Sequence, residues 1–232
     1  MEIVLLTAVG VGFSTIFGGI LGFIFKGIFE KSNHIIMSFA SGVMLASSIF
    51  GLVIPALEYS VWVVLLGIFL GAFVIYIVGK VTPSIEGFSK FGERNGILLF
   101  VLAIAIHNLP EGIATGVAFG TGDLGQALTV AVGIALQNIP EGMIIISPLL
   151  SLGFSKGKTF LIALFTGFSE ILGTIIGYFT ISLASSILPF ALAFAGGCML
   201  YVINDDMLKG EKSSPFSLLF GFCLIILFNA LL

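Results

Sequence analysis

Long apolar runs separated by short polar stretches restrict what this chain can fold into more than any other feature of its sequence. A helix needs about 20 apolar residues to cross the hydrocarbon core of a bilayer. Only 9% of the residues are charged, against about 25% in soluble domains. We therefore predict one all-α transmembrane domain over residues 1–232. Its eight predicted spans are residues 3–25, 34–57, 61–79, 97–120, 124–150, 158–181, 187–207 and 214–232.

The basic residues predict how the helices are oriented. All nine Lys and Arg residues fall in the first, third, fifth and seventh predicted loops or at the adjoining helix ends. Because basic residues are retained on the cytoplasmic side, these loops are predicted to be cytoplasmic and both termini extracytoplasmic. No basic region precedes the first apolar run, so we expect that helix to be retained in a multi-pass protein of the cell (inner) membrane. The basic residues are Lys26, Lys31, Lys80, Lys90, Arg94, Lys156, Lys158, Lys209 and Lys212.

Two related polar motifs interrupt the fourth and fifth spans. Helical rise from the start of its span places His107 about 15 Å deep, near the middle of the bilayer. Gln137 and Glu170 lie at a similar depth along their own spans. Polar groups at that depth are costly, so three helices that bring them to one level favour a shared site. The motifs are His107-Asn108-Leu109-Pro110-Glu111-Gly112 and Gln137-Asn138-Ile139-Pro140-Glu141-Gly142.

Within each motif, the first residue and the glutamate lie four positions apart. His107 and Glu111 are therefore expected on one face of the fourth helix, and Gln137 and Glu141 on one face of the fifth. Imidazole and oxygen ligands suit Zn2+, Fe2+, Mn2+ or Co2+. With Glu170 the set holds three carboxylates, and each costs about 2.5–3.5 kcal/mol at a helix centre. A divalent cation could balance their charge; protonated carboxyl groups bonded across the bundle remain an alternative.

Each motif also carries a proline inside a predicted helix. Pro110 and Pro140 cannot donate a backbone hydrogen bond and crowd the carbonyl four residues earlier, which predicts kinked fourth and fifth helices. The freed carbonyls of Ile106 and Leu136 need new partners, and a cation, a water molecule or a neighbouring helix could each provide one.

Acidic residues also lie near the predicted membrane surfaces. Asp205 and Asp206 fall at the cytoplasmic end of the seventh helix, and Glu58 falls at the outer end of the second. These side chains could attract cations that leave or reach the midplane, because a charged site raises the local concentration of counter-ions. Ordinary solvated helix ends are also compatible with their positions.

The two motifs resemble those of the ZIP (Zrt-, Irt-like) family of divalent metal transporters, in particular its bacterial GufA-like branch. Residues 39–46, Phe-Ala-Ser-Gly-Val-Met-Leu-Ala, are similar to the family's second helix, and residues 193–201 are similar to its seventh. The resemblance implies eight helices with both termini outside, in agreement with the charge pattern. It also implies a homodimer and an elevator-like movement of the metal-binding helices against the others.

The resemblance further implies a two-metal site between the fourth and fifth helices. The residues implied for the first ion are His107, Glu111, Gln137 and Glu141. The residues implied for the second ion are Asn108, Asn138 and Glu170. Glu111 and Glu141 would bridge the two ions, and Met44 would lie on the route by which ions enter.

These observations predict a transporter that imports a divalent transition metal into the cytoplasm. Zn2+ is the first candidate, and Fe2+, Mn2+ and Cd2+ are others. The expected partners are divalent ions, the lipid bilayer and a second copy of the chain, with no nucleic acid and no resident cofactor. ATP is not expected to drive transport, because the sequence contains no P-loop.

Two alternatives remain open. An intramembrane metallohydrolase would also place His107 near Glu111, but the His-Glu-x-x-His signature is absent because Asn108 follows His107. We therefore do not expect an enzyme. A proton-linked carrier of an organic cation would use the carboxylates without any metal.

Overall fold

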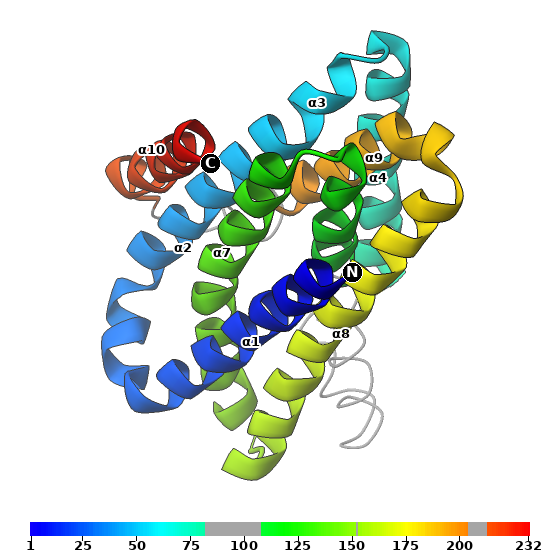
Figure 1. Cartoon of the computed structure of the whole chain (residues 1–232). Helices are drawn as coiled ribbons and strands as arrows, with labels where there is room; N and C mark the ends of the chain where they lie inside the picture. The colour runs from blue at the N-terminus through cyan, green and yellow to red at the C-terminus, as the bar shows by residue number, and fades with distance from the viewer. Residues whose placement is uncertain (82–107, 152, 204–212) are drawn as a thin grey trace.

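The computed structural model describes residues 1–81, 108–151, 153–203 and 213–232, and the regular elements within these ranges are all helical (Figure 1). Within the described ranges, six helical segments are long and apolar enough to cross a membrane, and α10 is a shorter apolar helix. The chain is therefore a multi-pass membrane protein. Its helices are α1 (Glu2–Ile24), α2 (Lys26–Ser48), α3 (Ile54–Leu57), α4 (Val61–Val81), a helix over residues 108–118, α7 (Leu124–Ser151), α8 (Lys156–Leu183), α9 (Leu188–Val202) and α10 (Pro215–Leu231).

The predicted spans agree with these helices to within a few residues, with one clear exception. The stretch 26–33 was predicted as a loop, but α2 begins at Lys26 and only Phe25 separates it from α1. The prediction was wrong because charged residues mark where a helix leaves the hydrocarbon, and the helix itself can continue into water. Residues 97–107 and 204–207 of the predicted spans lie outside the described residues.

A π-helix, η1 (Ile49–Val53), joins α2 to α3 and was not predicted. Pro55 has no N–H for the carbonyl of Gly51, four residues earlier, so the ordinary α-helical bond is impossible there. The Gly51 carbonyl instead accepts a hydrogen bond from Gln126 Nε2 of α7, at 3.2 Å. A side chain from another helix thus satisfies the group that the proline leaves free.

The structure does not test the kinks predicted at Pro110 and Pro140. α7 is a continuous α-helix through Pro140, and Pro110 lies in the first turn of the described helix over 108–118. The kinks at these two prolines therefore stay predictions.

The helices form two groups. In the first, α1 packs against α7 and α8, and the helix over 108–118 packs against α8. In the second, α4 packs against α9, and α2 packs against α10. The contact between α2 and α7 joins the two groups, and an apolar core that includes Met44, Val130 and Ile134 lies there.

Glycines allow the backbones within each group to approach closely. A Cβ atom on Gly112 or Gly116 would overlap a backbone carbonyl of α8, and one on Gly71 would overlap the carbonyl of Phe194 in α9. Small residues permit such contacts between membrane helices, whose packing depends on van der Waals contact. The helix with the first motif is therefore fixed against α8 along its length.

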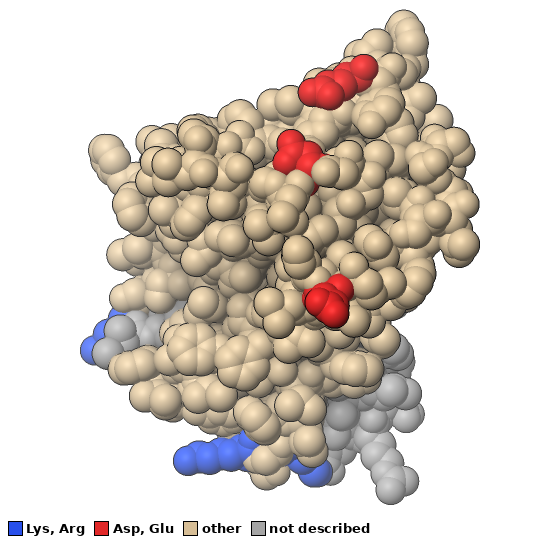
Figure 2. Space-filling view, in the orientation of Figure 1, with Lys and Arg blue, Asp and Glu red and all other residues tan. Residues whose placement is uncertain are grey.

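The two ends of the helix bundle differ in charge. The α1–α2 and α7–α8 connections lie at one end of the bundle, and the α3–α4 and α8–α9 connections lie at the other (Figure 1). Figure 2 shows the basic side chains near the first end and the acidic side chains on the rest of this face. Lys156 and Lys158 lie in the first turn of α8, at the basic end.

Candidate metal centre

Five of the polar residues singled out in the sequence are buried inside the first helix group. Asn108 and Glu111 come from the helix over 108–118, Gln137 and Asn138 from α7, and Glu170 from α8. Each is at most 4% exposed. Glu141, one turn after Gln137, is half-buried. His107, Asp205 and Asp206 lie outside the described residues.

Glu170 is the centre of a hydrogen-bond network that joins four helices. Asn138 Nδ2 donates to its Oε2 at 2.6 Å, and Asn108 Nδ2 donates to its Oε1. Thr15 Oγ1 of α1 also donates to Oε1, at 2.6 Å. Sequence reasoning missed Thr15, because a threonine in an apolar helix normally bonds back to its own helix and gives no sign of a distant partner.

Three oxygen atoms at this site have no hydrogen-bond partner among the described residues. Gln137 Nε2 donates to Glu111 Oε1 at 2.9 Å, but Glu111 Oε2, Gln137 Oε1 and Asn138 Oδ1 are buried and unpaired. A buried acceptor without a partner costs about 1–3 kcal/mol. Carboxylate and amide oxygens are ligands for divalent cations, so the donor set fits a cation.

Carboxylates from three helices lie within electrostatic range at this site. Glu111 and Glu141 are each near enough to Glu170 for their charges to interact. In the described parts of the chain, His, Cys, Asp and Glu side chains alone do not form a group of three that could hold a metal. In the geometry seen here, a cation would therefore bind through carboxylate and amide oxygens together.

The two predicted pathway residues that the structure describes, Met44 and Glu58, do not belong to this hydrogen-bonded cluster. Met44 is 1% exposed and packs in the apolar core between α2 and α7. Glu58 lines a pocket of about 420 Å3 at the end of the molecule opposite the basic turns. Met44 therefore belongs to the packed core and does not line that pocket.

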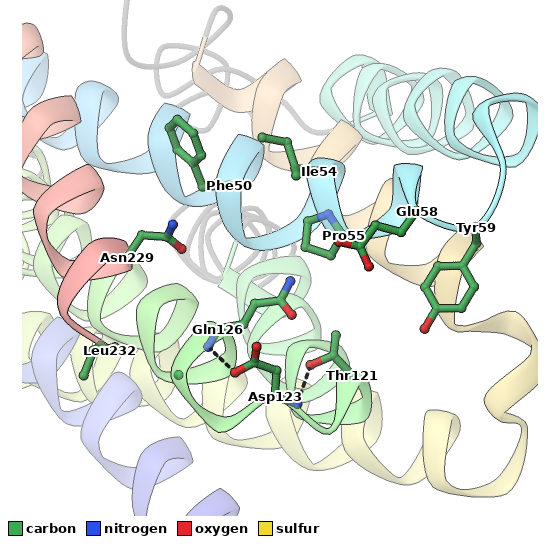
Figure 3. A pocket seen from close by; sticks show the side chains of 11 residues that line it. Phe50, Ile54, Pro55, Glu58, Tyr59, Thr121, Asp123, Gln126, Asn229 and Leu232 are labelled. Atoms are coloured by element: carbon green, nitrogen blue, oxygen red, sulfur yellow. Dashed lines mark hydrogen bonds between the residues drawn. The ribbon is translucent and has the colours of Figure 1, made fainter.

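The pocket contains a second acidic residue that sequence reasoning did not single out. Figure 3 shows Glu58 at the end of α3 and Asp123 at the start of α7, on facing walls. Asp123 Oδ1 accepts from the backbone N–H of Gln126 at 3.1 Å, which caps α7. The Asp that precedes a long apolar run is the sequence signal that could have identified this cap.

Comparisons with known proteins agree with the class that the fold and the buried cluster define, a multi-pass helical membrane protein with polar groups at its centre. The sequence profile of the family described as ZIP Zinc transporter matches residues 86–229, which include both motifs. The chain belongs to the ZIP family, whose named members here are transporters and not enzymes.

Three bacterial relatives share most of the chain. Zinc transporter GufA of Myxococcus xanthus is 34% identical over 201 residues, which are 78% of this chain and 79% of the relative. Zinc transporter ZIPB of Bordetella bronchiseptica is 30% identical over 240 residues, 94% of this chain and 78% of the relative. Zinc transporter ZupT of Chlorobaculum parvum is 30% identical over 224 residues, 85% of this chain and 83% of the relative.

Proposed function

We propose that this protein imports divalent transition-metal ions across the cell membrane, with Zn2+ as its principal substrate. The observation that carries the proposal is the set of three buried oxygen atoms on Glu111, Gln137 and Asn138 that have no partner in the described parts of the chain. A divalent cation would give these acceptors a partner and would balance the nearby carboxylates. The names of the three bacterial relatives support zinc over the other candidate ions.

The proposed site holds two ions. His107, Glu111, Gln137 and Glu141 would bind the first. Asn108, Asn138 and Glu170 would complete the second, with Glu111 and Glu141 as bridges. The unpaired Glu111 Oε2 and Gln137 Oε1 support the first set. In the second set, both Asn side chains donate amide N–H groups to Glu170, and Asn138 Oδ1 has no partner among the described residues, which supports Asn138 as a ligand.

The proposed direction of transport is inward, and the proposed topology has eight spans with both termini outside. An inside-negative potential of 100 mV favours entry of an M2+ ion by about 4.6 kcal/mol. Glu58 and Asp123 would concentrate cations in the outer pocket, and Met44 would line the route inward. Asp205 and Asp206 would receive ions at the cytoplasmic end.

The proposed movement is an elevator, in a homodimer. Close backbone contacts hold α1 to α7 and α8, α4 to α9, and α2 to α10, and the α2–α7 contact joins the two groups through a largely apolar core. The group with α1, α7 and α8 carries the buried polar cluster and would move as one body. α4 leaves large apolar side chains exposed, among them Trp62 and Phe69, which is compatible with lipid or a second copy.

Zinc uptake into proteoliposomes tests the proposal. The purified protein should produce saturable entry that a dye inside the vesicles reports, and an impermeant chelator outside should abolish it. Competition by Fe2+, Mn2+ and Cd2+ then ranks the other candidate ions. Uptake of none of these ions above that of empty vesicles would refute metal transport, and chelator-resistant uptake of an organic cation would support the alternative carrier.

Cysteine labelling should reveal the predicted sidedness. In a variant without Cys198 and Cys223, Tyr59→Cys lies in the α3–α4 turn and Ser155→Cys lies before α8. We expect an impermeant maleimide to label Tyr59→Cys in intact cells, and to label Ser155→Cys only after permeabilisation, because the lysines beside Ser155 mark the cytoplasmic side. The reverse pattern would show that the orientation is inverted.

A further inference from the structure

Thr15 differs from the other buried threonines of the described residues. Each of the others donates its hydroxyl hydrogen bond to a carbonyl three or four residues earlier in its own helix or cap; they are Thr115, Thr129, Thr159, Thr166 and Thr174. Thr15 is fully buried but donates to Glu170 Oε1, a side chain 155 residues away, at 2.6 Å. Its hydroxyl therefore serves the polar cluster and not its own helix.

Close backbone contacts on two sides hold α1 where Thr15 can reach Glu170. A Cβ atom on Gly18 would overlap the carbonyl of Ile139, inside the second motif, and one on Gly142 would overlap the carbonyl of Thr15 itself. On the other side, Gly12 and Gly167 face each other's carbonyls across the α1–α8 contact. The position of the Thr15 hydroxyl is thus set by α7 and α8 together.

We infer that Thr15 is a positioning residue of the metal site, which holds the Glu170 carboxylate in place while an ion is bound. This inference rests on the proposed function. Among the residues that the structure describes, Glu170 has three side-chain donors, Thr15, Asn108 and Asn138. The two Asn residues are themselves proposed ligands, so a bound ion would engage the same amide groups that donate to Glu170. Of these three donors, Thr15 is the one that is not itself a proposed ligand, so its bond to Glu170 does not compete with binding of an ion.

The consequence is a site in which α1 takes part without contributing a ligand. Hydrogen bonds from outside the ligand set orient the ligands of metal sites, and their loss typically weakens metal affinity by 10–100-fold. Without the Thr15 hydroxyl, Glu170 would lose the one donor among the described residues that is not a proposed ligand, and its carboxylate would sample more orientations. Affinity for the ion should fall even though each ligand is still present.

Zinc binding to the detergent-solubilised full chain, measured by calorimetry, tests this inference alongside uptake into proteoliposomes. Thr15→Val should weaken zinc binding by about 10-fold and raise the half-saturating zinc concentration of uptake to match. Thr15→Ser, which keeps the hydroxyl, should remain close to the native protein. Thr166→Val is the matched control, because Thr166 is equally buried in α8 but bonds to the carbonyl of Ala163.

Native-like zinc affinity in a folded Thr15→Val protein would overturn the inference while the proposed function stands. An equal loss in Thr166→Val would also overturn it, because the loss would then reflect packing. If Thr15→Val does not elute as a folded species in size-exclusion chromatography, Thr15→Ala removes the hydroxyl without an added methyl group and decides in its place. A native protein that neither binds nor transports zinc would refute the proposed function, and the inference with it.

Discussion

Replacing Glu111 or Glu141 with alanine should abolish zinc uptake into proteoliposomes. Both carboxylates are proposed to bridge the two ions, so either change removes a ligand and leaves the site one negative charge short. Loss of a hydrogen-bond partner outside the ligand set typically lowers metal affinity or activity by about 10–100-fold. Loss of a bridging ligand should lower zinc uptake by more than about 100-fold. Dye-reported zinc entry at several zinc concentrations measures the effect.

Two controls separate this effect from loss of the fold. Glu111→Gln keeps the shape of the side chain and a partner for Gln137, yet removes the charge, so it should fold and still fail to transport. Glu2→Ala removes an exposed carboxylate from the first turn of α1 and should transport like the native protein. Normal uptake by a folded Glu111→Ala or Glu141→Ala protein would contradict the proposed site.

Alanine at Gly18 should destabilise the protein strongly, whereas alanine at Gly10 of the same helix should stabilise it. A Cβ atom on Gly18 would meet the backbone of Ile139 in the second motif, and one on Gly10 would meet nothing within 4 Å. Overpacking typically costs 1–3 kcal/mol and occasionally more. We expect a large cost at Gly18, because the obstacle is the backbone of Ile139, which cannot change rotamer and must be displaced. Gly10→Ala should gain about 0.5–1 kcal/mol through its better helix propensity.

Thermal unfolding in detergent compares the two changes directly. Since the displaced α1 also carries Thr15, Gly18→Ala should weaken zinc binding as well as lower the Tm. Equal Tm values for Gly18→Ala and Gly10→Ala would show that α1 does not pack on the motif as closely as the structure indicates.

Much of the fold could be predicted from the sequence, because lipid forces helices to be long and apolar and forces charges to their ends. The all-α membrane architecture is confirmed, whereas the loop predicted from Lys26 is wrong because charge reports depth in the bilayer and not helix termination. The η1 turn was missed because Pro55 lies near the end of an apolar run, where a proline is unremarkable. Only the three-dimensional contact with Gln126 shows how its effect is accommodated.

Part of the candidate site could likewise be predicted from the sequence, and part could not. Spacing and depth singled out Glu111, Gln137 and Glu170, and the resemblance to the ZIP family added Asn108 and Asn138. The structure places these residues in one buried cluster; their roles as ligands stay predictions. Thr15 could not be found, because its partner is a long-range contact set by glycines on three helices. Spacing along the sequence predicts which side chains share one face of a helix. It does not predict which other helix packs against that face.

The π turn at Ile49–Val53 has a consequence for the pocket at the outer end. A single π turn adds one residue to an α-helix, and each residue of an α-helix advances the chain by about 100° around the axis. Residues after the turn are therefore out of phase with those before it by about that angle. Glu58 follows the turn and lines the pocket opposite Asp123. In an uninterrupted α-helix the same side chain would point about a quarter of a turn away from that pocket.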